Sequence, residues 1–134
     1  RNTNRDFSLI RMDRRVVPSG RLWNPAADVY RVSEGWVVKV DLAGVCTDEL
    51  EIELHGSTLI IRGCRKDTHI REGFVYQQME IEYGSFQRRI TLAEDVDPAG
   101  AEATYERGLL KVVLPLAPKP RTGRITIVLA QDRP

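Results

Sequence analysis

Thiol and imidazole groups are the side chains with the widest chemistry in this chain of 134 residues, because both bind metals and exchange protons. They belong to Cys46, Cys64, His55 and His69. Protein zinc sites use closely spaced pairs such as C-x-x-C or H-x-x-x-H, and the chain contains no such pair. We therefore expect no metal site and no cofactor, and we interpret both cysteines as structural. Two cysteines are too few for a disulfide framework, which favours a reducing, cytoplasmic compartment.

The acidic residues show no arrangement that is typical of an active site. They are spread along alternating segments, as solvated faces usually are, and no glycine-rich phosphate loop is present. Neither histidine has a recognisable catalytic setting. We therefore expect a protein that is not an enzyme and that has no small-molecule substrate.

The charge balance argues against two further classes of partner. Twenty basic and nineteen acidic residues give a net charge of +1, which is too small a field to indicate a nucleic acid. No run of about 18 apolar residues exists, so we expect no membrane span. The first six residues also lack the apolar core of a secretory signal. The composition, 42% hydrophobic and 29% charged, is that of one globular domain.

An isolated apolar triplet near the C-terminus is the strongest candidate for recognition chemistry. Pro115, Pro118 and Pro120 end the last strand pattern, because proline cannot donate to a ladder. Beyond them lies Ile125-Thr126-Ile127. A strand-prone segment on a proline-rich tether is typical of a ligand for a groove on another sheet. The alternative is a disordered end.

An alternation of apolar and polar residues predicts the secondary structure elements that position these residues. Apolar and polar residues alternate in short segments, which is the signature of strands with one buried face. The segments are 36–40, 50–54, 59–61, 79–83, 86–92, 101–105 and 110–114. Turn residues such as His55-Gly56-Ser57 and Arg107-Gly108 separate them. The pattern predicts an all-β sandwich with no helix longer than a single turn, near residues 48–50.

Arg88 is the one charged residue that this pattern places among apolar side chains. It shares strand parity with Phe86, Ile90 and Leu92. A guanidinium on that face needs a carboxylate or carbonyls, because unpaired burial of charge is costly. Asp67 and Glu72 are acidic residues that would suit it. The alternative is a bulge that turns Arg88 to solvent.

Three motifs resemble the α-crystallin domain of small heat-shock proteins, in the form found in bacteria and plants. Residues 103–115 match the pattern A-x-x-x-x-G-x-L-x-V-x-x-P. Residues 83–88, followed by Leu92 and by 96–98, are similar to the family's G-x-F-x-R block, and Ile125-Thr126-Ile127 is similar to its I-x-I tail motif. Residues 25–30 and 40–45 are also close to family patterns. The resemblance covers about residues 24–128 in the right order.

The resemblance implies an immunoglobulin-like antiparallel β-sandwich. Residues 1–23 would form a flexible N-terminal arm, 24–116 the α-crystallin domain and 117–134 the C-terminal tail. The implied activity is ATP-independent capture of unfolding client proteins, which prevents their aggregation. The implied partners are a second copy of the chain in a homodimer and further copies in a higher homo-oligomer.

The resemblance also implies roles for particular residues. The tail residues Ile125 and Ile127 would enter a groove lined by Ile52, Leu54, Ala101, Ala103 and Tyr105. The long loop 65–78 would cross to a partner and pair with its edge strand. The residues of this dimer interface would be Ala27, Asp28, Val29, Tyr30, Phe74, Val75, Tyr76 and Arg88. The alternatives are that Ile52 and Leu54 are ordinary core and that the loop folds onto its own sandwich.

Client capture is implied, by analogy, for the apolar residues Phe7, Leu9, Ile10 and Met12 of the arm. Such segments adapt to many partners, although a plain disordered end has the same composition. Two other functions fit a sandwich of this kind: a non-oligomerising scaffold of the related CS-domain type, and a dedicated assembly protein for one cellular structure. The tail triplet and the long loop favour the chaperone.

Overall fold

The computed structural model of the chain describes residues 23–68, 71–118 and 124–130. These residues form eight strands and two single turns of 3-10 helix, η1 (Thr47–Glu49) and η2 (Pro98–Gly100). The strands are β1 (Ala27–Val32), β2 (Gly35–Asp41), β3 (Glu51–His55), β4 (Thr58–Arg65), β5 (Gly84–Thr91), β6 (Glu102–Glu106), β7 (Leu109–Pro115) and β8 (Arg124–Thr126). No helix of the described residues is long and apolar enough to cross a membrane.

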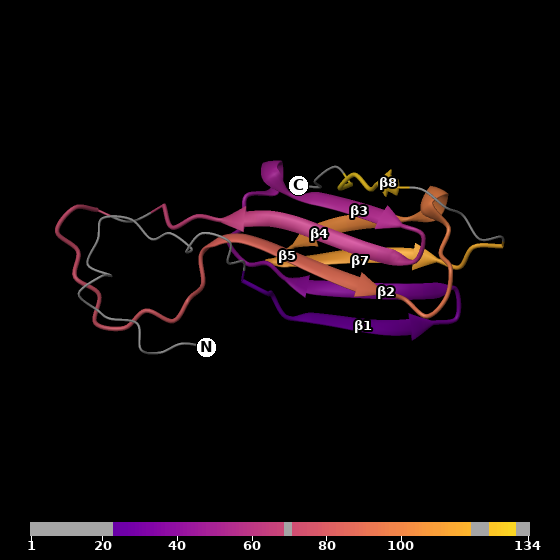
Figure 1. Cartoon of the computed structure of the whole chain (residues 1–134), viewed down its shortest axis with the longest axis horizontal. Coiled ribbons are helices and arrows are strands. Elements are labelled where there is room, and N and C mark those ends of the chain that lie inside the picture. Colours follow the sequence, from indigo (N-terminus) through magenta and orange to yellow (C-terminus); the bar gives the residue numbers. More distant parts are fainter. Residues whose placement is uncertain (1–22, 69–70, 119–123, 131–134) are drawn as a thin grey trace.

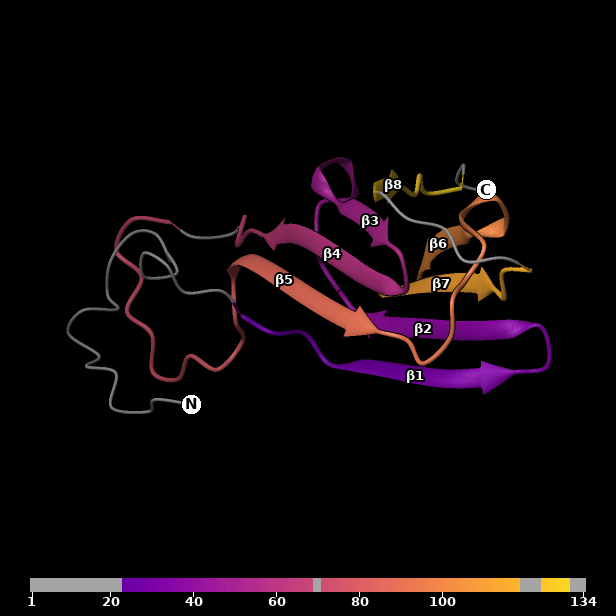
Figure 2. The same cartoon turned by 45° about the vertical axis from the view of Figure 1, so that its right-hand side comes forward.

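The strands form two four-stranded antiparallel sheets, in the orders β1-β2-β7-β6 and β5-β4-β3-β8. The sheets stack face to face, as Figures 1 and 2 show. The order places the edge strands β1 and β5 on one side of the sandwich, where Trp23 bridges to Phe86. It places β6 on the other side, near β3 and β8, where Ala103 bridges to Leu129. The predicted all-β sandwich is confirmed.

The core lies between the two sheets and consists of the alternating apolar residues of the strands. Val38 and Val40 of β2 and Ile52 and Leu54 of β3 belong to one continuous cluster of buried side chains. Burial of one face explains the period-two pattern, because successive side chains of a strand point to opposite faces. The larger buried set also includes Leu59, Ile61, Phe86, Leu110, Val112 and Leu114.

A left-handed turn sets the register of β6 on β7. Arg107 has φ 55° and Gly108 has φ 82°, so both central residues of this two-residue hairpin adopt positive φ. The added Cβ of any other residue at Gly108 would lie 3.1 Å from the backbone of Ala43. The turn pairs Glu106 with Leu109 and so carries Ala103 opposite Val112.

The predicted strand at 79–83 is wrong. The chain is irregular there, the side chain of Ile81 is 59% exposed, and β5 begins only at Gly84. Residues 66–68 and 71–83 belong to a long connection that extends past the ends of β4 and β5 (Figure 1). An alternating pattern becomes a strand only beside a partner strand, and no described strand runs alongside this segment.

Candidate functional site

The tail lies along the edge of β3. Strand β8 is antiparallel to β3, with Leu54 opposite Ile125 and Glu53 opposite Thr126. The amide of Ile127 then donates to the carbonyl of Ile52 at 2.8 Å. Three residues further on, the amide of Ala130 donates to the carbonyl of Ala103 on β6 at 2.7 Å. The tail therefore spans from the edge of one sheet to the edge of the other.

The space between β3 and β6 is a groove that accepts an isoleucine. Ile127 is only 7% exposed and belongs to the core cluster with Ile52, Leu54 and Ala103. The short side chain of Ala103 leaves room for the larger one. Ile125 lies at the rim and is 38% exposed. The structure thus brings together the predicted tail residues and three of the predicted groove residues within one chain.

The remaining predicted groove residues flank this contact. Ala101 and Tyr105 are half-buried and pack against the core cluster. The Tyr105 hydroxyl donates to the carbonyl of Leu42 at 2.8 Å, which fixes the ring at the end of the groove. The docking of a tail from a second copy in this groove stays a prediction.

A carboxylate on β3 adds an electrostatic contact to the tail. The Glu53 Oε1 atom lies 3.2 Å from Nε2 of His55, 3.3 Å from Nη1 of Arg62 and 3.9 Å from Nη1 of Arg124 in the tail. The hydrogen bond from His55 lowers the pKa of Glu53, and Arg62 and Arg124 lower it further, against an opposing effect of burial. The ionised carboxylate therefore favours the docked tail.

The opposite side of the sandwich is an open edge. No described strand pairs with the outer edge of β1, whose backbone groups are therefore available to another chain. Val29 and Tyr30 are exposed there, as is Asp28, whereas Ala27 is half-buried against the core. An exposed edge strand with apolar side chains is a surface for pairing.

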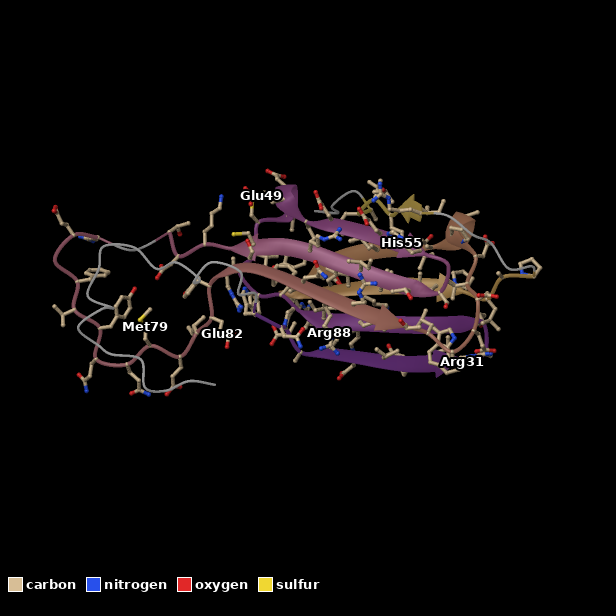
Figure 3. All side chains as sticks on the ribbon, viewed as in Figure 1. Arg31, Glu49, His55, Met79, Glu82 and Arg88 are labelled. Atoms are coloured by element: carbon tan, nitrogen blue, oxygen red, sulfur yellow. The ribbon has the colours of Figure 1, made fainter. Side chains whose placement is uncertain are left out.

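Arg88 of β5 lies on this same side. It is half-buried opposite Ile61 in a ladder that runs without a bulge from Gly84 to Thr91, so the predicted inward parity holds along the strand. Its Nε atom is buried and has no hydrogen-bond partner among the described residues. Figure 3 shows Arg88 on the side of the sandwich where β1 lies. The guanidinium thus lacks, in the single chain, the acceptor that burial calls for.

The two acidic residues named as possible partners of Arg88 do not contact it within the described chain, and their contact with Arg88 of a second copy stays a prediction. Neither Asp67 nor Glu72 forms an ion pair with Arg88 among the described residues, and Asp67 accepts a hydrogen bond from the Tyr76 hydroxyl at 3.2 Å. Both acids belong to the loop that extends away from the sandwich (Figure 2). No described residue therefore supplies an acceptor for Nε of Arg88.

The loop carries the other half of the predicted dimer interface. Val75 is 77% exposed, and the ring of Phe74 meets the ring of Tyr76 edge to face, with their centroids 6.4 Å apart. Residues 74–76 form no strand in the single chain. Their pairing with β1 of a partner stays a prediction.

An aromatic contact at the start of the sandwich was not predicted from the sequence. Trp23, assigned from the sequence to the arm, donates from Nε1 to the carbonyl of Gly84 at 3.0 Å. Its ring packs on Phe86 with centroids 5.2 Å apart, and the Arg65 guanidinium lies 4.2 Å from its centroid. A tryptophan directly ahead of the first strand was the signal for this contact, because large aromatic rings are seldom left in solvent.

An ion pair that joins the two sheets at the far end of β1 was not predicted either. Glu94, in the connection after β5, accepts hydrogen bonds from Arg31 Nε at 2.7 Å and from Trp36 Nε1 at 3.1 Å. The hydrogen bond from Arg31 lowers the pKa of Glu94. No spacing in the sequence indicates this contact, because it links residues 63 positions apart.

Some predicted residues fall outside the described part of the chain. These are the client-binding candidates Phe7, Leu9, Ile10 and Met12, and also His69. Among the residues that are described, no three histidine, cysteine, aspartate or glutamate side chains lie close enough together to hold a metal ion.

Comparison with known proteins places this arrangement in a family. The model of the Hsp20/alpha crystallin family matches residues 28–128. Spore protein SP21 of Stigmatella aurantiaca is 32% identical over 103 residues, which are 77% of this chain and 61% of that protein. The chain therefore spans about three fifths of the length of that relative.

Solved structures show the same sandwich. Heat shock protein 16.0 from Schizosaccharomyces pombe superposes with a TM-score of 0.66 at 28% identity, over 75% of this chain and 94% of that chain. A small heat-shock protein from Xylella fastidiosa, described as having a distinct high order structure, superposes with a TM-score of 0.64 at 28% identity. The match covers 78% of this chain and 98% of that chain. The motifs, the two sheets and the family match agree, and the chain belongs to the Hsp20/alpha crystallin family.

Proposed function

We propose that this protein is an ATP-independent holdase chaperone, which binds partly unfolded proteins and prevents their aggregation, and which works as a dimer-based oligomer. One observation supports the proposal: the tail lies in the groove between β3 and β6 on one side of the sandwich, and the edge of β1 on the other side is unpaired among the described strands. Partly unfolded proteins expose extended chain and apolar side chains, which are the groups that such surfaces bind. The membership of the Hsp20/alpha crystallin family supports it.

The dimer is proposed to form on the β1 side. Strand β1 offers a free edge, and the loop of a second copy offers the apolar residues 74–76 to pair with it. The unpartnered Nε of Arg88 supports this choice of side, because an acceptor from a second copy would remove the cost of burying it. Pairing would also cover an edge that otherwise invites aggregation.

Larger assemblies are proposed to form through the tail. The groove accepts Ile127 from its own chain, and the same backbone and side-chain contacts are available to the tail of another copy. Each contact is small, so it is reversible, and many contacts together hold an assembly by avidity. The described high order structure of the Xylella fastidiosa relative supports this step.

We propose that the protein works in the cytoplasm without catalysis, cofactor, nucleic acid, membrane or small-molecule substrate. Both described cysteines are free, which suits a reducing compartment. The near-equal numbers of basic and acidic residues suit protein clients better than polyanions. The arm residues Phe7, Leu9, Ile10 and Met12 are proposed to contribute to client binding.

Size-exclusion chromatography with light scattering tests the assembly. We expect the intact chain to form species larger than a dimer, and a chain truncated after Pro120 to form dimers. A matched control is the Val128→Ala chain, whose changed residue is 78% exposed, and it should assemble like the intact chain. An intact chain that stays monomeric at high concentration would contradict the proposal and favour a non-oligomerising scaffold.

Light scattering during heating tests the activity. We expect the chain to suppress aggregation of several unrelated heat-labile proteins in the absence of nucleotide, whereas an equal mass of a stable, unrelated protein does not. Suppression limited to one target would instead indicate a dedicated assembly protein.

A further inference from the structure

The fold places the two cysteines directly opposite each other, although 18 positions separate them in the sequence. Val45 and Arg65 form an antiparallel bridge, so the next pair in register is Cys46 with Cys64. The amide of Cys46 donates to the carbonyl of Cys64 at 3.4 Å. The backbone of Cys46 is extended, with φ −86° and ψ 109°, which continues the pairing by one residue past the bridge.

The two thiols also share a face of the sheet. In an antiparallel pair, directly opposite residues project to the same side. Val45 belongs to the core cluster, as do Leu59 and Ile61 of β4, whereas Ile60 is buried outside that cluster; Cys46 and Cys64 alternate with the core positions and so project from the other face. Both cysteines are partly exposed, and a small oxidant can therefore reach them.

Lys66, two residues after Cys64, is held at the turn η1 by an ion pair. Lys66 follows Cys64 on the same face, and its Nζ atom lies 3.0 Å from Oε2 of Glu49, the residue labelled at the turn η1 in Figure 3. The hydrogen bond to Glu49 is the main cause of a raised pKa of Lys66, and the charges of Cys64 and Cys46 raise it further.

The backbone geometry suits a covalent link. Cα atoms of a hydrogen-bonded antiparallel pair lie about 5.5 Å apart, inside the range of about 4.4–6.8 Å found for disulfides. The Cβ atoms of such a pair must approach by about 1 Å to reach the disulfide distance. Cys46 lies in a connection outside the named strands, held to β4 by a long hydrogen bond, so the approach disturbs no regular ladder.

We propose that Cys46 and Cys64 are a redox-sensitive pair that forms a cross-strand disulfide when the protein meets a peroxide. The disulfide would join the connection that leads into β3 to strand β4, and would close a loop over residues 47–63. This proposal does not rest on the proposed chaperone function, because it concerns the register of two residues and the chemistry of their thiols.

The reaction balances with one peroxide molecule. The thiolate of one cysteine attacks a peroxide oxygen, the O–O bond breaks, and a sulfenic acid and a water molecule form. The thiolate of the second cysteine attacks the sulfenic sulfur, the S–O bond breaks, the S–S bond forms, and a second water molecule leaves. In total two thiols lose two electrons and two protons, and hydrogen peroxide becomes two molecules of water. The Lys66 ammonium attracts the attacking thiolate.

The test treats the reduced, full chain with hydrogen peroxide. We expect both free thiols to disappear together, the intact mass to fall by about 2 Da for the two hydrogen atoms, and the product to migrate as a single chain on a non-reducing gel. Peptide mapping should find one crosslinked pair containing both cysteines, and a thiol reductant should restore both thiols. The oxidised chain should also melt at a higher temperature than the reduced chain, because the link restricts the unfolded state.

Serine variants provide the controls. Cys46→Ser and Cys64→Ser each leave one thiol. Neither variant should form an internal disulfide, and the melting temperature of neither should rise after treatment with hydrogen peroxide. Lys66→Gln should slow the loss of thiols several-fold, whereas Glu49→Gln, which frees the ammonium, should speed it. The proposal that Cys46 and Cys64 form an internal disulfide would be overturned if both thiols persisted in the wild-type chain, or if the only products were interchain disulfides or sulfinic acids. An unchanged rate in Lys66→Gln would overturn the role of the ammonium.

Discussion

Truncation of one tail isoleucine tests how the groove between β3 and β6 holds its ligand. Ile127→Ala removes the side chain that is 7% exposed within the core cluster, and leaves the backbone of the tail unchanged. Ile125→Ala removes the neighbouring isoleucine at the rim, which is 38% exposed. The two residues have the same chemistry and differ in burial, so their comparison isolates the effect of the groove.

The expected magnitudes follow from the buried areas. Full burial of an isoleucine side chain is worth about 1.5–3 kcal/mol, so Ile127→Ala should weaken docking by about 2 kcal/mol, or roughly 30-fold. Ile125 is less buried, so Ile125→Ala should weaken docking of the tail by about 1 kcal/mol, or roughly fivefold. Val128 is 78% exposed, and Val128→Ala should change docking by less than about twofold.

Hydrogen exchange of the tail amides measures docking directly. The amide of Ile127 is bonded to the carbonyl of Ile52 and that of Ala130 to the carbonyl of Ala103, so both are protected only while the tail is docked. We expect their protection to fall in the order Val128→Ala, Ile125→Ala, Ile127→Ala, with the last showing the largest loss. Equal losses in all three variants, or unchanged protection in Ile127→Ala, would refute the conclusion that burial of Ile127 holds the tail.

Charge changes at the two sides of the sandwich give two further predictions. The hydrogen bond from His55 is the largest cause of the lowered pKa of Glu53, and the charge of Arg124 in the tail is a smaller one; through Arg124 the ionised carboxylate stabilises the docked tail above the ordinary value of 4.5, and this contribution disappears as the pH falls through the lowered value. At pH values below 4.5, the protection of the Ile127 amide against hydrogen exchange should therefore decrease in the native chain and decrease less in Glu53→Gln. An equal decrease in the two chains would exclude a role for the carboxylate. Arg88→Ala should raise the dimer dissociation constant roughly 5- to 150-fold, which corresponds to the loss of about 1–3 kcal/mol when a buried hydrogen-bonded group is removed. Sedimentation equilibrium measures it, and an unchanged constant together with unchanged melting would place Arg88 outside the interface.

Short-range pattern was sufficient to predict the strands of the sandwich. The segments 36–40, 50–54 and 110–114 alternate because one face of each is buried. The first lies within β2 and the third within β7, and the second overlaps β3 in all but its first residue. The hairpin at Arg107-Gly108 was also predictable, because a glycine such as Gly108 is favoured at positive φ, although Arg107 adopts positive φ without being a glycine. These features depend on neighbours in the sequence, which is why a single sequence is enough to predict them.

Features that depend on a distant partner were not predictable. Residues 79–83 have the alternation of a strand, yet no described strand runs beside them, and the pattern alone does not report that. The contact of Glu94 with Arg31, and the register that sets Cys46 opposite Cys64, both follow from how strands align across the fold. The parity of Arg88 was predicted correctly along β5, but its acceptor was not, because no described residue supplies one.

The positions of the two binding surfaces decide what kind of assembly the proposed interactions would build. The groove lies between β3 and β6 and the free edge lies at β1, and the sheet orders put β1 and β6 at opposite ends of one sheet. Occupation of one surface therefore leaves the other open. If the β1 side closes in a pair, each pair still presents two grooves and two tails, and a tail that leaves its own groove for that of a neighbouring pair extends the assembly. The exchange adds no new contact type and replaces one docked tail by another, so the balance between a closed pair and a larger oligomer is set by concentration and by the geometry of the tether. Under this proposal, a chain whose tail is docked in its own groove is the form in which a subunit leaves the oligomer and can join it again.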